Sequence, residues 1–146
     1  MSVLDATYDY ETEQVTSADD LVALLDKVAS LRLPTWLELA TPEGDALHVG
    51  LGSDFSSLRF IEGRDDGQVY HSAPTLDSPQ EATFQFGTVP TTMDTGSAIT
   101  VAEARAAAAE FQRTGRRPEG VKWKLVESPT VVDTEPFSWD ETVDPN

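Results

Sequence analysis

The sequence contains no cysteine among its 146 residues. A disulfide framework, a zinc–thiolate site and a thiol nucleophile are therefore excluded. The N-terminal segment has no basic region followed by a long apolar run, which a signal peptide would require. No stretch approaches the roughly twenty apolar residues that span a membrane. We therefore expect a cytoplasmic protein that does not enter membranes.

Basic side chains are scarce, because ten Lys and Arg oppose 26 Asp and Glu, for a net charge of −16 at pH 7. Such a field repels nucleic acids and anionic membrane surfaces, so neither is an expected partner. A basic protein partner would be attracted and its encounter accelerated. The alternative interpretation is a general charge that keeps the protein in solution.

Motifs that carry catalysis are also missing. His48 and His71 fall in separate expected strands and lack the close spacing of metal ligands. The serines lack a G-x-S-x-G elbow, and the pair of glycines at 50 and 52 lacks the third glycine of a dinucleotide loop. A zinc deaminase needs a cysteine pair that this chain does not have. We therefore expect no enzyme, no cofactor and no metal.

The clearest element is a helix that opens at Thr100. Glu103 stands at the spacing of a capping box, and five alanines follow with high helix propensity. Gly115 fits a left-handed C-terminal cap, and Pro118 prevents the helix from continuing. The alternation from Val121 to Leu125 then predicts a half-buried strand.

The remaining pattern predicts an α+β fold. Consecutive hairpins, one of them signalled by Asp66-Gly67, indicate a mostly antiparallel sheet of about five to seven strands. Two amphipathic helices would cover one face of this sheet and leave the other free to be polar. We expect a first helix over 17–30, strands over 6–14, 36–39, 47–51, 58–62, 68–72, 83–87 and 121–125, and loops over 73–81 and 89–97.

The composition changes after the last expected strand. From Glu127 onward there are six acidic residues and no basic one, and three prolines argue against a helix. Phe137 and Trp139 are too apolar for a purely solvating tail. We expect a single domain over 1–127 and an acidic extension over 128–146 that docks either on the domain or on a partner.

One short pattern carries a family resemblance. The signature F-x-x-T-G-x-R-P-x-x-V-x-W, preceded by the run FQFG at 84–87, resembles a family of immunity proteins from bacterial polymorphic toxin systems. This family is commonly encoded beside deaminase-fold toxins. The match is clearest over 70–123, and the chain departs from it by running about twenty residues past the last strand. The signature comprises Phe111, Thr114, Gly115, Arg117, Pro118, Val121 and Trp123.

The resemblance implies an antitoxin function. The protein would be a monomer that binds a cognate secreted toxin, a basic domain of deaminase fold, in a one-to-one complex. It would neutralise this nucleic-acid deaminase by occluding its active-site cleft. The alternative hypothesis is a small α+β enzyme or ligand-binding domain that uses the polar sheet face as its site.

Candidate contact residues follow from the surface pattern and not from the resemblance. Tight binding would require a few aromatic anchors within an acidic surround. The candidate anchors are Tyr8, Tyr10, Phe55 and Tyr70, and the candidate charges are Asp9, Glu11, Asp54, Asp65 and Asp66.

Overall fold

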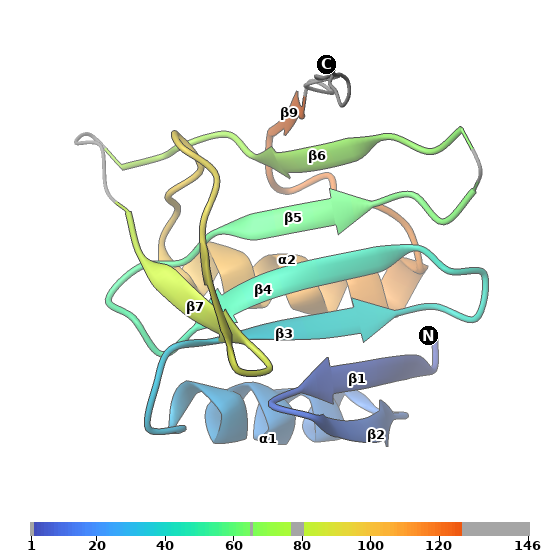
Figure 1. Ribbon diagram of the computed structural model, residues 1–146. Coiled ribbons are helices and arrows are strands. Elements are labelled where there is room, and N and C mark those ends of the chain that lie inside the picture. Colours follow the sequence, from blue (N-terminus) through green and yellow to red (C-terminus); the bar gives the residue numbers. More distant parts are fainter. Residues whose placement is uncertain (1, 65, 77–80, 127–146) are drawn as a thin grey trace, which may run out of the picture.

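The computed structural model describes residues 2–64, 66–76 and 81–126. Within them, nine strands and two helices form an α+β fold (Figure 1). Seven strands lie in the order β2-β1-β3-β4-β5-β6-β9, all antiparallel to their neighbours, and β7 and β8 form a hairpin off this path. The elements are β1 (Leu4–Tyr8), β2 (Glu11–Val15), α1 (Ala18–Ala29), β3 (Thr35–Ala40), β4 (Ala46–Leu51), β5 (Leu58–Ile61), β6 (Val69–Ser72), β7 (Thr83–Phe86), β8 (Val89–Thr92), α2 (Val101–Thr114) and β9 (Trp123–Leu125).

Both helices lie on the same face of the sheet, and the β7–β8 hairpin crosses the other face (Figure 1). The ends of α2 confirm the expected caps. The Thr100 hydroxyl accepts a hydrogen bond from the backbone N–H of Glu103, whose carboxylate accepts one from the N–H of Thr100. Gly115 closes the helix with a φ of 69°, a conformation that glycine adopts without steric cost.

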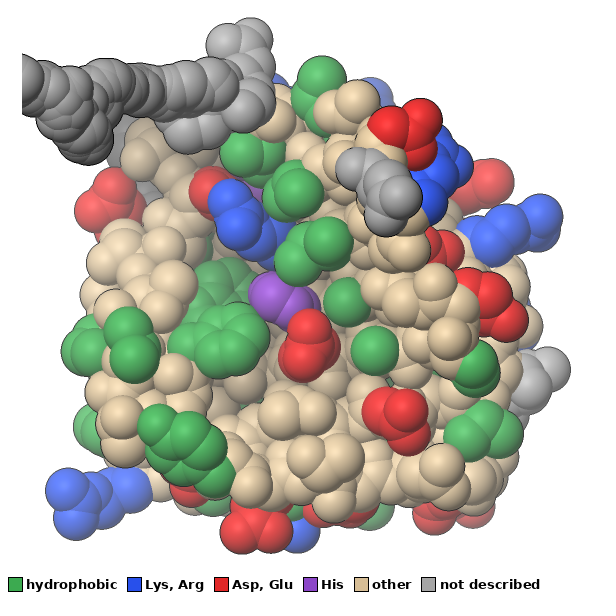
Figure 2. Space-filling model, turned by 45° about the vertical axis from the view of Figure 1, so that its right-hand side comes forward, with side chains coloured by type: hydrophobic (Ala, Val, Ile, Leu, Met, Phe, Trp, Pro, Cys, Tyr) green, Lys and Arg blue, Asp and Glu red, His purple; other side chains and the backbone are tan. Residues whose placement is uncertain are grey.

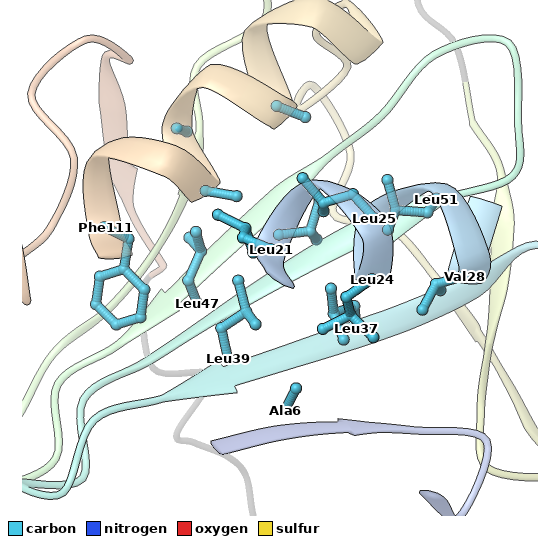
Figure 3. Packing of buried hydrophobic residues seen from close by; sticks show 14 of the residues in the cluster. Ala6, Leu21, Leu24, Leu25, Val28, Leu37, Leu39, Leu47, Leu51 and Phe111 are labelled. Atoms are coloured by element: carbon cyan, nitrogen blue, oxygen red, sulfur yellow. The ribbon is translucent and has the colours of Figure 1, made fainter. Parts of the chain in front are cut away.

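The main hydrophobic core lies between the helices and the sheet. One face of α1 supplies Leu21, Leu24, Leu25 and Val28, which pack on inward-facing leucines of β3 and β4 (Figure 3). Three buried alanines of α2 allow that helix to approach the sheet closely, and Phe111 fills the space beside them.

A second, smaller core holds the β7–β8 hairpin against the opposite face. It consists of Trp36, Phe84, Met93 and Ala98. The indole N–H of Trp36 donates to the carbonyl oxygen of Thr91 at 3.2 Å. A Cβ atom added at Gly50 would lie 2.6 Å from the Phe84 ring. The absence of a side chain at position 50 therefore lets the hairpin pack closely against the sheet.

The expected fold class is confirmed, but the sheet has more strands than the five to seven expected. The segment 6–14, expected as one strand, is the β1–β2 hairpin, whose turn residues Asp9 and Tyr10 both have positive φ. This turn contains no glycine or asparagine to signal it. The expected loop 89–97 begins with strand β8, where Pro90 is tolerated because only β7 pairs with this strand.

The acidic extension expected over 128–146 lies outside the described residues. In the part of the chain that is described, neither helix is long and apolar enough to cross a membrane.

Candidate partner-binding surface

A row of polar side chains crosses the sheet on the face away from the helices. Directly opposite residues of antiparallel strands project to the same side, so the register places one residue from each strand in a line. Leucines at alternate positions of β3 and β4 point into the main core, which assigns the row to the open face. The row runs Thr12, Thr7, Glu38, His48, Arg59, His71, Lys124.

Two charge-assisted contacts hold the middle of this row in place. Glu38 accepts a hydrogen bond at 3.1 Å from Nε2 of His48, and this bond lowers the pKa of the Glu38 carboxyl. Arg59 donates from Nε to Asp94 at 3.2 Å, which ties the row to the segment after β8. The side chains in the middle of the polar row are therefore held in place in the free protein.

A hollow of about 180 Å³ opens where the β7–β8 hairpin overhangs this row. Its walls include Trp36, His48, Arg59, Phe86 and Asp94. The rings of His48 and Phe86 meet edge to face, with centroids 5.4 Å apart. Figure 2 shows hydrophobic side chains gathered beside the histidine, with acidic and basic groups next to it.

This hollow does not have the arrangement of a hydrolytic site. Among the described residues, no hydroxyl is hydrogen-bonded to His48, so the hydroxyl–histidine pair of a nucleophilic hydrolase is not formed there. Residues 2–64, 66–76 and 81–126 also contain no group of three or more His, Asp or Glu placed to hold a metal ion. What the surface offers is fixed charge beside exposed apolar side chains, which is the chemistry of protein recognition.

Of the predicted anchors, Tyr8 lies in the core. Its side chain is only 3% exposed, and its hydroxyl donates to Glu13 at 2.6 Å. Burial and this bond raise the pKa of the hydroxyl. Tyr8 alternates with outward-facing residues of β1 and pairs with Glu11 of β2. The strand register therefore directs its ring to the helix-covered face of the sheet. We therefore leave Tyr8 out of the contact surface.

Its neighbours Asp9, Tyr10 and Glu11 are all exposed, at the turn of the first hairpin. Tyr10 is 72% exposed, the highest value among the large hydrophobic side chains that the structure describes. Its hydroxyl nevertheless accepts a hydrogen bond from the backbone N–H of Thr88 at 3.1 Å and lies 3.0 Å from the Thr88 hydroxyl. These bonds lower the pKa of Tyr10 and join the two hairpins.

The other predicted residues do not join this turn. Asp54 is exposed, and Phe55 is half-buried against the second core. Asp66 is exposed and paired with Arg64 near the β5–β6 turn, at the opposite end of the sheet from the β1–β2 turn (Figure 1). Asp65 lies outside the described residues.

Tyr70 lies on the helix-covered side of the sheet, where Arg117 stacks over its ring at 4.1 Å. It lines a hollow of about 700 Å³ together with Arg116 and Trp123. The predicted residues therefore belong to at least two separate surfaces, and Asp9, Tyr10 and Glu11 form a compact exposed group.

The sequence did not predict three exposed apolar residues around the contact of Tyr10 with Thr88. Phe86 and Val89 flank Gly87 and Thr88 in the β7–β8 hairpin, and Leu33 lines a hollow with Asp9 and Thr88. Leu33 is 50% exposed, Phe86 43% and Val89 61%. We call Tyr10, Leu33, Phe86 and Val89 the hairpin corner. The alternation of Phe84 and Phe86 with polar residues was the available signal for strand β7, but the segment after Gly87 was interpreted as a loop.

The match to a family model covers residues 9–125, from the β1–β2 turn to the last strand. The chain belongs to the Imm1 family of immunity proteins. Imm1 membership assigns the protein an immunity function against a toxin and favours a binding protein over an enzyme. The Imm1 match includes the hairpin corner and every residue of the polar row except Thr7. No curated protein matches the chain in sequence.

Proposed function

We propose that this protein neutralises a cognate toxin by stoichiometric binding, without turnover. The Imm1 match carries the proposal, because it extends over nearly all of the described residues and is the basis for an immunity function. We further infer that the toxin is a basic, nucleic-acid-modifying domain of deaminase fold. The net charge of −16 supports a basic partner.

The mechanism we propose is occlusion of the toxin cleft that admits nucleic acid. Such a cleft must attract phosphate, so Lys and Arg line it. Exposed carboxylates such as Asp9 and Glu11 would occupy the positions of the phosphates, and Tyr10 between them would supply apolar contact. The complex would be one-to-one and would form in the cytoplasm, where the toxin would meet nucleic acid.

The alternative is a small enzyme that works on the open sheet face. The Glu38–His48 pair beside the 180 Å³ hollow is the feature that would have to perform its chemistry. Among the described residues this pair has no hydroxyl partner, which is why we prefer binding.

Co-expression with the toxin domain encoded beside the gene tests the proposal in cells, and titration of purified toxin tests it in solution. We expect survival on co-expression and a loss of toxin activity that saturates at one equivalent. Protection at far below one equivalent would indicate turnover and would overturn the proposal.

The charge argument has its own test. Association should be fast at low salt and clearly slower at high salt, because exposed charges are screened over about 10 Å at 0.1 M ionic strength. Asp9→Asn with Glu11→Lys should lower the association rate while the melting temperature stays constant, because Asn adopts the positive φ of position 9 easily. Association that does not depend on salt would contradict steering by this acidic surface.

A further inference from the structure

We propose that the hairpin corner is the apolar anchor of the toxin interface and that Tyr10 is its central residue. This inference rests on the proposed function. It adds to that function the place on the surface where binding energy is concentrated and the chemistry of the toxin surface that meets it.

The first observation is the backbone of the β1–β2 turn. Asp9 and Tyr10 have φ values of 45° and 66°, the conformation that two-residue hairpin turns require and that Asn and Gly adopt most easily. A tyrosine at the second position is therefore not the choice that favours folding. Strain of this kind is kept where it positions a side chain for use.

The second observation is that the Tyr10 ring is exposed yet fixed. Its hydroxyl is bonded to Thr88, and a Cβ atom at Gly87 would lie 2.8 Å from the ring, so the ring rests on the tip of the other hairpin. Figure 1 shows the β1–β2 turn beside the β7–β8 tip. A ring that is already held loses little conformational entropy on binding, which is the property of a binding hot spot.

The third observation is that apolar exposure is concentrated here. Of the seven large hydrophobic side chains exposed in the described residues, four belong to the hairpin corner. Leu33 shares an open hollow of about 480 Å³ with Asp9 and Thr88, and Phe86 continues the surface to His48 and the polar row. Protein–protein interfaces commonly have an apolar core surrounded by a polar rim, and the hairpin corner with its bordering charges has this arrangement.

Charge complementarity favours the toxin as the partner that covers the hairpin corner. A second copy of this chain would bring its own exposed Asp9 and Glu11 and a charge of −16 against the same carboxylates. The acidic extension of this chain would be repelled in the same way. A basic toxin surface has the opposite charge, with Lys or Arg facing Asp9 and Glu11 around an apolar recess that receives the phenol ring.

The test compares binding of the purified toxin domain to four variants. Tyr10→Gly removes the ring and keeps a residue suited to positive φ, so the turn is preserved. Leu33→Ser and Phe86→Ala probe the rest of the corner without changing the turn. Leu125→Ala is the matched control, because Leu125 is 51% exposed but lies on β9, at the far edge of the sheet.

We expect Tyr10→Gly to weaken the toxin Kd by about 30-fold or more, as truncation of a hot-spot aromatic does. The loss should appear in the dissociation rate, because the ring acts after the encounter, whereas Asp9→Asn with Glu11→Lys should act on the association rate. Leu33→Ser and Phe86→Ala should each weaken binding by at least 5-fold, and Leu125→Ala should not change it.

Two outcomes would overturn the inference, and they differ. If the wild-type protein inhibits at one equivalent while Tyr10→Gly, Leu33→Ser and Phe86→Ala keep the wild-type Kd, the hairpin corner is not the anchor but the proposed function stands. If the wild-type protein does not bind the toxin, both fall. Melting temperatures of all four variants separate lost binding from lost folding.

Discussion

Alternate residues of β3 meet two different environments. Leu37 and Leu39 are fully buried beneath the helices, whereas Glu38 between them lies in the open polar row. The helix-covered face is closely packed and apolar beneath the two helices, and a hollow of about 700 Å³ opens beside Tyr70 and Trp123. The open face carries fixed charge, a small hollow and an overhanging hairpin. We propose that the helix-covered face mainly provides stability and that the open face provides contact with the toxin, so substitutions on the two faces should have separable effects.

Phe111→Ala should break the fold most strongly. The ring is fully buried, with its centroid 5.8 Å from that of Phe60 in an edge-to-face arrangement. Truncation should lower the free energy of unfolding by about 3–5 kcal/mol, measured by urea denaturation. Where the variant remains folded, its toxin Kd should equal that of the wild type. A weakened Kd in the folded state would show that the faces are not independent.

Trp123→Ala, on the same face of the sheet, should lower the free energy of unfolding by a smaller amount. Trp123 packs against the main core but is only partly buried, and its indole N–H donates to the Pro118 carbonyl oxygen at 2.7 Å. We expect a loss of about 2–3 kcal/mol, below the range for a fully buried aromatic residue. A loss below about 1 kcal/mol would mean that β9 contributes little to the folded state.

Gly50→Ala should lower both the stability of the fold and the affinity for the toxin. The added Cβ would lie 2.6 Å from the Phe84 ring, so the β7–β8 hairpin must shift. We expect a destabilisation of about 1–3 kcal/mol, as overpacked sites show. Unlike Phe111→Ala, this change should also weaken toxin binding, because the hairpin holds Phe86, Val89 and the contact to Tyr10. Unchanged toxin affinity would argue against a role for the hairpin in binding.

Glu38→Gln should have the smallest effect, and it should depend on pH. The bond from His48 lowers the folded-state pKa of Glu38, so the carboxylate stabilises the fold fully above its ordinary value of 4.5. That contribution is lost as the pH falls through the lower folded-state pKa. Because the side chain is one-third exposed, we expect on the order of 0.5 kcal/mol at neutral pH and none in strong acid. A difference between wild type and variant that persists in strong acid would rule out this explanation.

Local signals explain what the sequence predicted well. Both helices were expected at their observed places, because Ser17 and Thr100 cap the helix starts and Gly115 caps the end of α2 within a few residues of chain. The strand pairs β3–β4 and β5–β6 were expected for the same reason, whereas the β1–β2 and β7–β8 hairpins were not. Elements defined by nearby residues are readable from one sequence.

The surface depends on distant residues and could not be predicted in the same way. The polar row exists only once the register aligns Glu38, His48 and Arg59 across three strands. Tyr10 is positioned by Thr88, which lies 78 residues further along the chain. The prediction placed Tyr8 at the surface. The alternation of Tyr8 and Asp9 does not determine which of these two side chains faces the core.

Amide hydrogen exchange, measured with and without the purified toxin domain, tests the separation of the two faces most directly. We expect the toxin to slow exchange in the β1–β2 turn and at the β7–β8 tip, around Tyr10 and Thr88. Exchange in α1 and α2 should stay as it is in the free protein. Protection concentrated on the exposed sides of the two helices, with the hairpin turns unaffected, would contradict this expectation.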